Sequence, residues 1–153
     1  MVSQEFWIHG NTLTVETPQN LASISHTGFA TKLQFLPGQS SWCHIAIPTP
    51  VRIDGHNLHV RNLYLLYNIN IGEGVITTAV VYDGPKLVKR IEGLSNADDH
   101  SWVVDFKNTI NLLGHHQVSF GMSISFLFQT AFDRPDLQPV IYITAAEAVF
   151  NNF

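Results

Sequence analysis

Charged residues are scarce in this sequence. Asp, Glu, Lys and Arg make up 13% of the 153 residues, whereas soluble proteins average about 25%. Hydrophobic residues make up 45%, and this combination excludes a disordered chain and a coiled coil. The net charge of -4 argues against a polyanionic partner, so we expect no nucleic-acid binding. Because interface cores are depleted in charge, the composition favours a homo-oligomer.

Cysteine and long hydrophobic runs are also lacking. Cys43 is the only cysteine, which excludes an internal disulfide framework and is typical of a buried, inert thiol. The apolar stretches fall far short of the ~20 residues that span a bilayer, so we expect no membrane partner. The first eight residues contain Glu5 and no Lys or Arg, unlike a secretory signal. We therefore expect a cytoplasmic protein with one domain over residues 1–153.

What the sequence does contain is alternation with a period of two. The clearest run is 118–128, where the even positions are large and apolar. The odd positions are Ser or Gly apart from Leu127. This pattern predicts a strand with one face in a core. Its other face, covered by small residues, would allow close approach of another sheet or a ligand.

Similar runs indicate an all-β fold. Turn signals such as Asp83-Gly84 separate them, and helix is almost absent apart from a short turn with Thr17 as cap and Pro18 at its first position. Nine or ten short, unequal strands with irregular loops predict a single-domain antiparallel β-sandwich of jelly-roll type. Besides 118–128, the predicted strands are 12–16, 29–35, 42–47, 58–70, 75–82, 86–92, 102–106 and 140–149.

Eight histidines raise the question of a metal site. No His-x-His pair occurs, although this spacing would place two alternate strand residues on the same face, where they could bind one ion. Ligands from distant strands, for example His9 with His44, remain an open alternative. Otherwise the histidines are interpreted as polar surface residues, and we predict no metal and no cofactor. They are His9, His26, His44, His56, His59, His100, His115 and His116.

Signatures of catalysis are thin. The sequence has no Gly-x-Ser-x-Gly elbow, Walker loop or Gly-x-Gly-x-x-Gly motif. Glu147 is the one conspicuous acid, because it lies in the apolar segment 145–149. It is either a solvent-facing residue at a sheet edge or a buried acid with a raised pKa, suited to acid/base work.

Each tryptophan lies two residues from a histidine. In a strand such residues share a face, so each pair presents a flat ring beside a hydrogen-bonding imidazole. That surface suits a sugar ring or an aromatic small molecule. The alternative is that each tryptophan is a core residue capped by a histidine at the sheet rim. The predicted ligand-binding residues are Trp7 with His9, Trp42 with His44, and Trp102 with His100.

Three motifs carry a resemblance to a known family. They are the opening Trp7-Ile8-His9-Gly10-Asn11, the segment 42–51 with Ile-Ala-Ile-Pro-Thr-Pro-Val at its end, and Val81-Tyr82-Asp83-Gly84-Pro85. Together they resemble a family of small microbial β-sandwich domains of unknown function. The resemblance spans most of the chain and implies the fold without an activity.

Three functions remain open at this point. The first is a homo-oligomeric β-sandwich module that binds a glycan or an apolar small molecule. The second is a cofactor-free enzyme, of cyclase or isomerase type, with an apolar pocket and a histidine or carboxylate as acid/base. The third is a structural, self-assembling protein that packs through the Ser/Gly face of 119–125 or through the apolar C-terminal tail.

Overall fold

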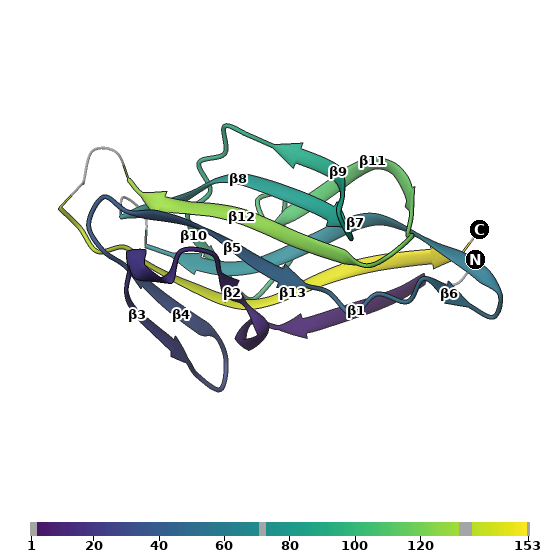
Figure 1. Ribbon diagram of the computed structural model, residues 1–153, viewed down its shortest axis with the longest axis horizontal. Helices are drawn as coiled ribbons and strands as arrows, with labels where there is room; N and C mark the ends of the chain where they lie inside the picture. The colour runs from purple at the N-terminus through teal and green to yellow at the C-terminus, as the bar shows by residue number, and fades with distance from the viewer. Residues whose placement is uncertain (1–2, 71–72, 132–135, 153) are drawn as a thin grey trace.

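The alternating segments form two antiparallel sheets packed face to face (Figure 1). The computed structural model describes residues 3–70, 73–131 and 136–152. Sheet A runs in the order β10 (Asp98–His100), β7 (His56–Ile69), β13 (Val140–Asn152), β4 (Thr31–Phe35) and β3 (Leu21–His26), with β1 (Ser3–His9) beside β13, and β11 (Thr109–Gln117) and β6 (Arg52–Ile53) beside β7. Sheet B runs in the order β2 (Thr14–Val15), β5 (Ser40–Ala46), β12 (Met122–Thr130), β8 (Gly74–Asp83) and β9 (Lys86–Ile91).

This architecture confirms the predicted all-β antiparallel sandwich with almost no helix. The described helices are η1 (Gly10–Thr12) and η2 (Pro18–Asn20), and neither is long or apolar enough to cross a membrane. The described residues form thirteen strands rather than nine or ten. Part of the excess is the very short strands β6 and β10, which leave little alternation in the sequence. The longer strands β1, β3 and β11 are also absent from the predicted set.

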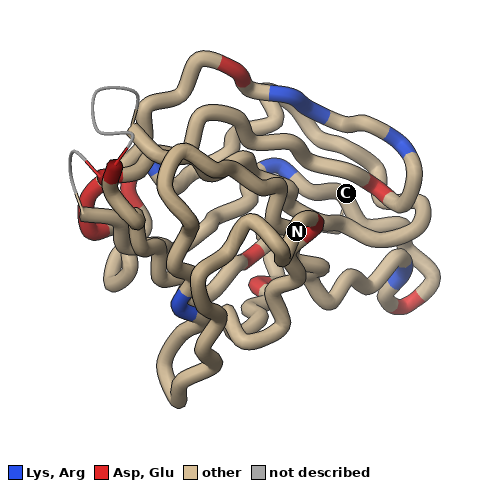
Figure 2. Tube along the Cα trace, turned by 60° about the vertical axis from the view of Figure 1, so that its left-hand side comes forward, with Lys and Arg blue, Asp and Glu red and all other residues tan. Residues whose placement is uncertain are grey.

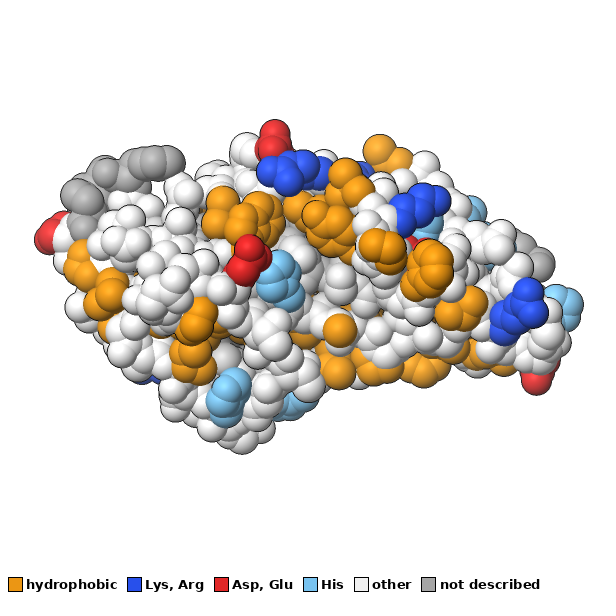
Figure 3. Space-filling model, viewed as in Figure 1, with side chains coloured by type: hydrophobic (Ala, Val, Ile, Leu, Met, Phe, Trp, Pro, Cys, Tyr) orange, Lys and Arg blue, Asp and Glu red, His pale blue; other side chains and the backbone are white. Residues whose placement is uncertain are grey.

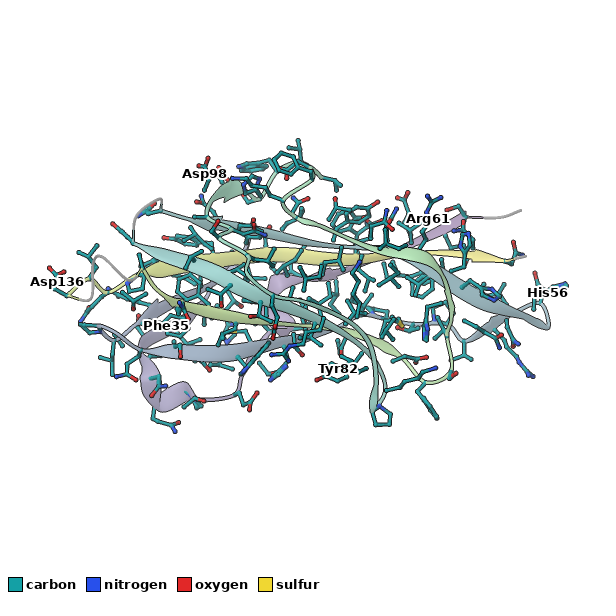
Figure 4. All side chains as sticks on the ribbon, turned by 90° about the horizontal axis from the view of Figure 1, so that it is seen from above. Phe35, His56, Arg61, Tyr82, Asp98 and Asp136 are labelled. Atoms are coloured by element: carbon teal, nitrogen blue, oxygen red, sulfur yellow. The ribbon has the colours of Figure 1, made fainter. Side chains whose placement is uncertain are left out.

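The core lies between the inward faces of the two sheets. Alternate residues of β12 and β13 are fully buried there, among them Ile124 and Phe126 of sheet B and Ile143 of sheet A. Phe35 and Phe128 meet across the core with ring centroids 4.8 Å apart. Figure 4 shows side chains filling the space between the layers. Burying each such side chain contributes about 1.5–3 kcal/mol, so the period-two pattern decides which face turns inward.

Two of the sequence motifs join strands at close quarters. Gly10 follows β1 where the chain passes over β13, and a Cβ there would lie 1.9 Å from the carbonyl oxygen of Ile143. Only glycine allows that approach. The Thr49 hydroxyl donates to the carbonyl of Ile47 at 2.6 Å and accepts the amide of Met122 at 2.9 Å. Thr49 thus fixes the end of β5 against the start of β12.

The third motif forms a buried hydrogen-bond network around the Asp83 carboxylate. Its carboxylate bonds His116 Nε2 at 2.8 Å and accepts three backbone amides, those of Ser119, Phe120 and Gly121, at 2.8–2.9 Å. Burial alone would raise the pKa of this carboxyl, but these hydrogen bonds lower it to about 2. The motif is therefore structural, as it organises the approach to β12.

Two of the predicted strands are wrong where side chains, rather than a neighbouring strand, accept the backbone amide hydrogens. The prediction of a strand from Val118 is wrong for its first four residues, since the strand begins at Met122. Asp83 accepts the amides of Ser119, Phe120 and Gly121, which a ladder would need. The strand predicted over 102–106 is wrong altogether, since that segment is a loop. There the amide of Asp105 bonds the Asn108 side chain rather than a neighbouring strand.

Candidate functional site

The loop 101–108 leaves sheet A between β10 and β11 and is clamped by its own side chains. The Asp105 carboxylate bonds His100 Nδ1 and accepts the amides of Lys107 at 2.7 Å and Asn108 at 3.3 Å. The Asn108 side chain accepts the amide of Asp105 at 2.8 Å and donates to the carbonyls of His100 and Val103. Burial raises the pKa of Asp105, but the His100 and backbone hydrogen bonds outweigh it and lower the pKa. The loop therefore has one defined backbone conformation.

This clamped loop holds apolar side chains in solvent. Trp102 is 86% exposed and Phe106 is 85% exposed. Thr144 of β13 ties the loop to sheet A, because its hydroxyl lies 3.2 Å from the carbonyl oxygen of Leu66 and 3.3 Å from that of Ser101. A large apolar side chain normally gains free energy by burial. A rigid loop that keeps a tryptophan exposed is typical of a binding surface.

Beneath Trp102 the outer face of sheet A is hollowed. The Tyr142 ring of β13 stacks on the Phe29 ring, with centroids 6.3 Å apart and planes 20° apart. Lys32 Nζ lies 5.9 Å from the centroid of the Tyr142 ring. The space measures about 420 Å³, within the range of small-molecule sites. Its lining residues are Phe29, Asn68, Ser101, Trp102, Tyr142 and Thr144. We call this space the aromatic hollow.

A second depression lies on the outer face of sheet B. Its floor is Ser125 of β12, and its walls include Trp42 of β5 and Tyr82 of β8. The Arg90 guanidinium lies 5.8 Å from the centroid of the Trp42 ring. The depression measures about 370 Å³ and is lined by Glu16, Trp42, His44, Val80, Tyr82, Arg90 and Ser125. We call it the sheet B groove. Figure 3 shows an acidic side chain beside a histidine here, with hydrophobic side chains on either side.

The hollow and the groove are on opposite sides of the sandwich. Asp98, next to the hollow loop, lies on one side in Figure 4, and Tyr82 of the groove lies on the other. The space between the sheets opens at one edge into a third depression of about 280 Å³, lined by residues such as Leu65, Ile76 and Phe126.

Comparison with known proteins identifies the family. A family model described as "Family of unknown function (DUF6623)" matches residues 1–139. The chain belongs to this family. The predicted resemblance to a family of unknown function is therefore confirmed. No curated protein matches the DUF6623 chain at a significant level.

Several of the solved structures that this chain resembles are carbohydrate-binding modules. A xylan binding module, CBM86, from Roseburia intestinalis is 14% identical, with 100% of this chain and 97% of that chain covered and a TM-score of 0.50. A family 29 module is 13% identical, with 97% and 90% covered and a TM-score of 0.46. A CBM36 domain of a xylanase from the hindgut metagenome of Trinervitermes trinervoides is 9% identical, with 95% and 96% covered and a TM-score of 0.43. At such low identity the CBM86 likeness shows the shared sandwich fold.

The predicted Trp/His pairs do not converge on one site. Trp7 and His9 share the outer face of β1 in sheet A, whereas Trp42 and His44 lie in the groove of sheet B. His9 and His44 therefore face different sides of the molecule. Among the described residues no group of three or more His, Cys, Asp or Glu side chains is placed to hold a metal ion.

The third pair is not a pair in space. His100 turns inward, with 12% of its side chain exposed, and packs on the Tyr67 ring with centroids 5.2 Å apart. Trp102 points away because the chain bends after β10 instead of continuing as a strand. His100 thus positions the loop, while Trp102 lines the hollow.

Glu147 fits the buried alternative. It lies in β13, which pairs with β1 on one side and β7 on the other, and is 2% exposed. Burial raises its pKa to about 7, with a further contribution from the nearby Glu5 carboxylate. Its Oε1 atom has no hydrogen-bond partner in the part of the chain that the structure describes. It lines neither the hollow nor the groove.

Sequence reasoning missed most of the aromatic hollow. Phe29, Asn68 and Tyr142 come from segments that are far apart in the chain, and no local spacing connects them. One signal was present: Asp105 and Asn108 are turn-forming residues three positions apart, and their side chains compete with strand pairing. That spacing would have predicted a loop rather than a strand around Trp102.

Proposed function

We propose that this DUF6623 protein binds a glycan in the aromatic hollow. A pyranose ring has apolar C–H faces and a polar rim. The rings of Trp102, Tyr142 and Phe29 can cover the faces, and Asn68 and Ser101 can bond the rim. The observation that carries the proposal is the 86% exposure of Trp102 on a clamped loop opposite a stacked aromatic pair.

The surroundings favour a neutral polymer over a charged or purely apolar ligand. Charged residues are few, although several acidic residues lie together at one end of the molecule (Figure 2). The six described residues that line the hollow are uncharged. Lys32 lies beside the Tyr142 ring, and the Asp99 carboxylate bonds the Ser101 hydroxyl. The hollow is open at the outer surface instead of enclosed in the core, so a chain can run through it. An apolar metabolite would gain more by entering an enclosed cavity.

The fold likeness to CBM86, a xylan binding module, supports the same proposal and suggests the first ligand. Isothermal titration calorimetry tests it, with xylan as the first ligand and the glucan oligosaccharide cellohexaose as the second. We expect binding that Trp102→Ala weakens by about tenfold or more, ~1.4 kcal/mol, because a stacking partner is lost. Phe106→Ala is the matched control, since this aromatic residue is equally exposed on the same loop but does not line the hollow.

Two outcomes would overturn the proposal. One is the absence of binding to both glycans and to a panel of other neutral polysaccharides in affinity electrophoresis. The other is binding that both alanine variants weaken equally, since this would indicate nonspecific adhesion to exposed rings. The homo-oligomer and the cytoplasmic location remain predictions, and light scattering at high concentration tests the first of them.

A further inference from the structure

The sheet B groove contains a serine, a histidine and a carboxylate in hydrogen-bonded order. His44 Nδ1 lies 2.7 Å from Ser125 Oγ, and His44 Nε2 lies 2.8 Å from Glu16 Oε2. We infer that Ser125, His44 and Glu16 form a nucleophile, base and orienting carboxylate that transfer the acyl group of a carboxylic ester. The activity is separate from glycan binding, because it uses the opposite face of the sandwich.

The sheet fixes this order. Ser125 of β12 and His44 of β5 are direct register partners, so their side chains stand side by side on the outer face. Thr14 of β2 is opposite His44, and the Glu16 amide bonds the Trp42 carbonyl at 2.9 Å. This bond carries Glu16 past the end of β2 on the same face. The strands β12 and β5 and the residue that follows β2 thus place the three groups in a row.

Burial follows the roles. Ser125 is 5% exposed and forms the floor of the groove. Its hydroxyl is hydrogen-bonded to His44 rather than to bulk water. The side chains of His44 and Glu16 are 38% and 57% exposed. A carboxylate on Nε2 accepts the proton of that nitrogen and leaves the Nδ1 lone pair facing the serine. This is the tautomer that a general base for Ser125 requires.

The reaction follows from this tautomer. Ser125 Oγ forms a bond to the ester carbonyl carbon as its proton passes to His44 Nδ1. The tetrahedral oxyanion then expels the alcohol oxygen, which takes the proton from Nδ1, and the acyl group stays on Ser125. A water molecule, deprotonated by His44, attacks the acyl carbonyl; the carboxylic acid leaves and Ser125 regains its proton. No redox partner is needed.

The groove also limits the rate. Ser125 lies in the middle of β12, between β5 and β8, so the surrounding amides serve the ladder and do not form a backbone oxyanion hole. The donors left for the oxyanion are the Tyr82 hydroxyl and the terminal nitrogens of Arg90, whose Nε donates to Glu92 at 2.7 Å. Lack of one preorganised donor costs about 10²–10³ in rate. Because acylation and deacylation both pass through an oxyanion, we expect measurable acylation only by reactive esters, and slow turnover.

The trapping experiment uses the intact protein and a fluorophosphonate probe, followed by peptide mass spectrometry. We expect one covalent adduct, on Ser125. Ser123→Ala is the matched control, because Ser123 is the next outward-facing residue of the same strand and lies opposite Ala46 rather than a histidine. It should leave labelling unchanged, while Ser125→Ala abolishes it. An adduct elsewhere, or none after prolonged incubation of folded protein, overturns the inference.

Variants of the other two residues test their roles with p-nitrophenyl acetate. Loss of a general base should slow acylation by about 100-fold or more in His44→Gln. Glu16 acts through His44, so Glu16→Gln should slow acylation while Glu16→Asp, which keeps the charge, restores part of the rate. Acylation that is indifferent to His44→Gln overturns the relay even if Ser125 is labelled. The glycan proposal is unaffected by any of these results.

Discussion

The pKa values of two buried carboxyl groups in this sandwich are shifted in opposite directions. Asp83 is 0% exposed and Glu147 is 2% exposed. Burial raises the pKa of both, yet the hydrogen bonds from His116 and three amides bring that of Asp83 down to about 2. Among the described residues Glu147 Oε1 has no hydrogen-bond partner, and burial together with the nearby Glu5 carboxylate raises the pKa of Glu147 to about 7.

The comparison shows that donors, rather than depth, decide the charge of a buried acid here. Asp83 terminates β8 and meets the amides of 119–121, which have no ladder partner. Glu147 lies inside β13, where the surrounding amides are already paired with β1 and β7. A carboxylate at a strand end can find free amides, whereas one within a central strand cannot.

The largest expected effect is that of removing the Asp83 charge. Asp83→Asn retains the shape of the side chain, but its neutral amide is a weaker hydrogen-bond acceptor for His116 and for the three backbone amides. We expect the free energy of unfolding at pH 7 to fall by about 2–4 kcal/mol, from the lost charge and from buried amides left with a poorer acceptor; urea denaturation measures it. Glu92→Gln is the control, because it breaks an exposed pair with Arg90, worth about 0–1 kcal/mol. A loss in Asp83→Asn no larger than the control would contradict the comparison.

Glu147 should have the opposite effect. Between pH 4.5 and 7 the folded chain keeps a proton on Glu147 that the unfolded chain releases. The free energy of unfolding therefore falls as pH rises through this window, by at most about 3 kcal/mol. Glu147→Gln should remove this limb and stabilise the protein at pH 8. Urea denaturation from pH 4.5 to 8 measures both, and a wild-type curve that is flat or rising across the window would show that Glu147 is ionised.

The dependence of stability on pH below pH 4 tests the same comparison through Asp83. The pKa of Asp83 lies below its usual 3.8, so the unfolded chain takes up a proton first as pH falls. The stability that Asp83 contributes is complete above pH 3.8 and is lost toward pH 2, by at most about 2 kcal/mol. Asp83→Asn should have a shallower acid limb than the wild type. Equal slopes below pH 4 would assign the limb to other carboxylates.

The same two regions show what the sequence could and could not predict. Alternation identified β12 and β13 correctly as core strands, because burial of one face requires an apolar residue at every second position. It failed at Val118, since the acceptor for the following amides is Asp83, 36 residues away for Ser119. Likewise, the sequence could not decide whether Glu147 is exposed or buried, because the pairing of β13 with both β1 and β7 depends on the whole sheet. Side chains that capture distant amides leave no local pattern.

Asp105 is an intermediate case and gives the smallest expected change in stability. Like Asp83 it accepts backbone amides beside a histidine, but 29% of its side chain is exposed and it serves the loop 101–108 rather than the core. Asp105→Asn should leave the urea midpoint nearly unchanged. It should weaken glycan binding by about twofold to tenfold, because Trp102 must then be ordered on binding. Calorimetry with xylan measures this, and unchanged affinity would show that the loop does not depend on the carboxylate.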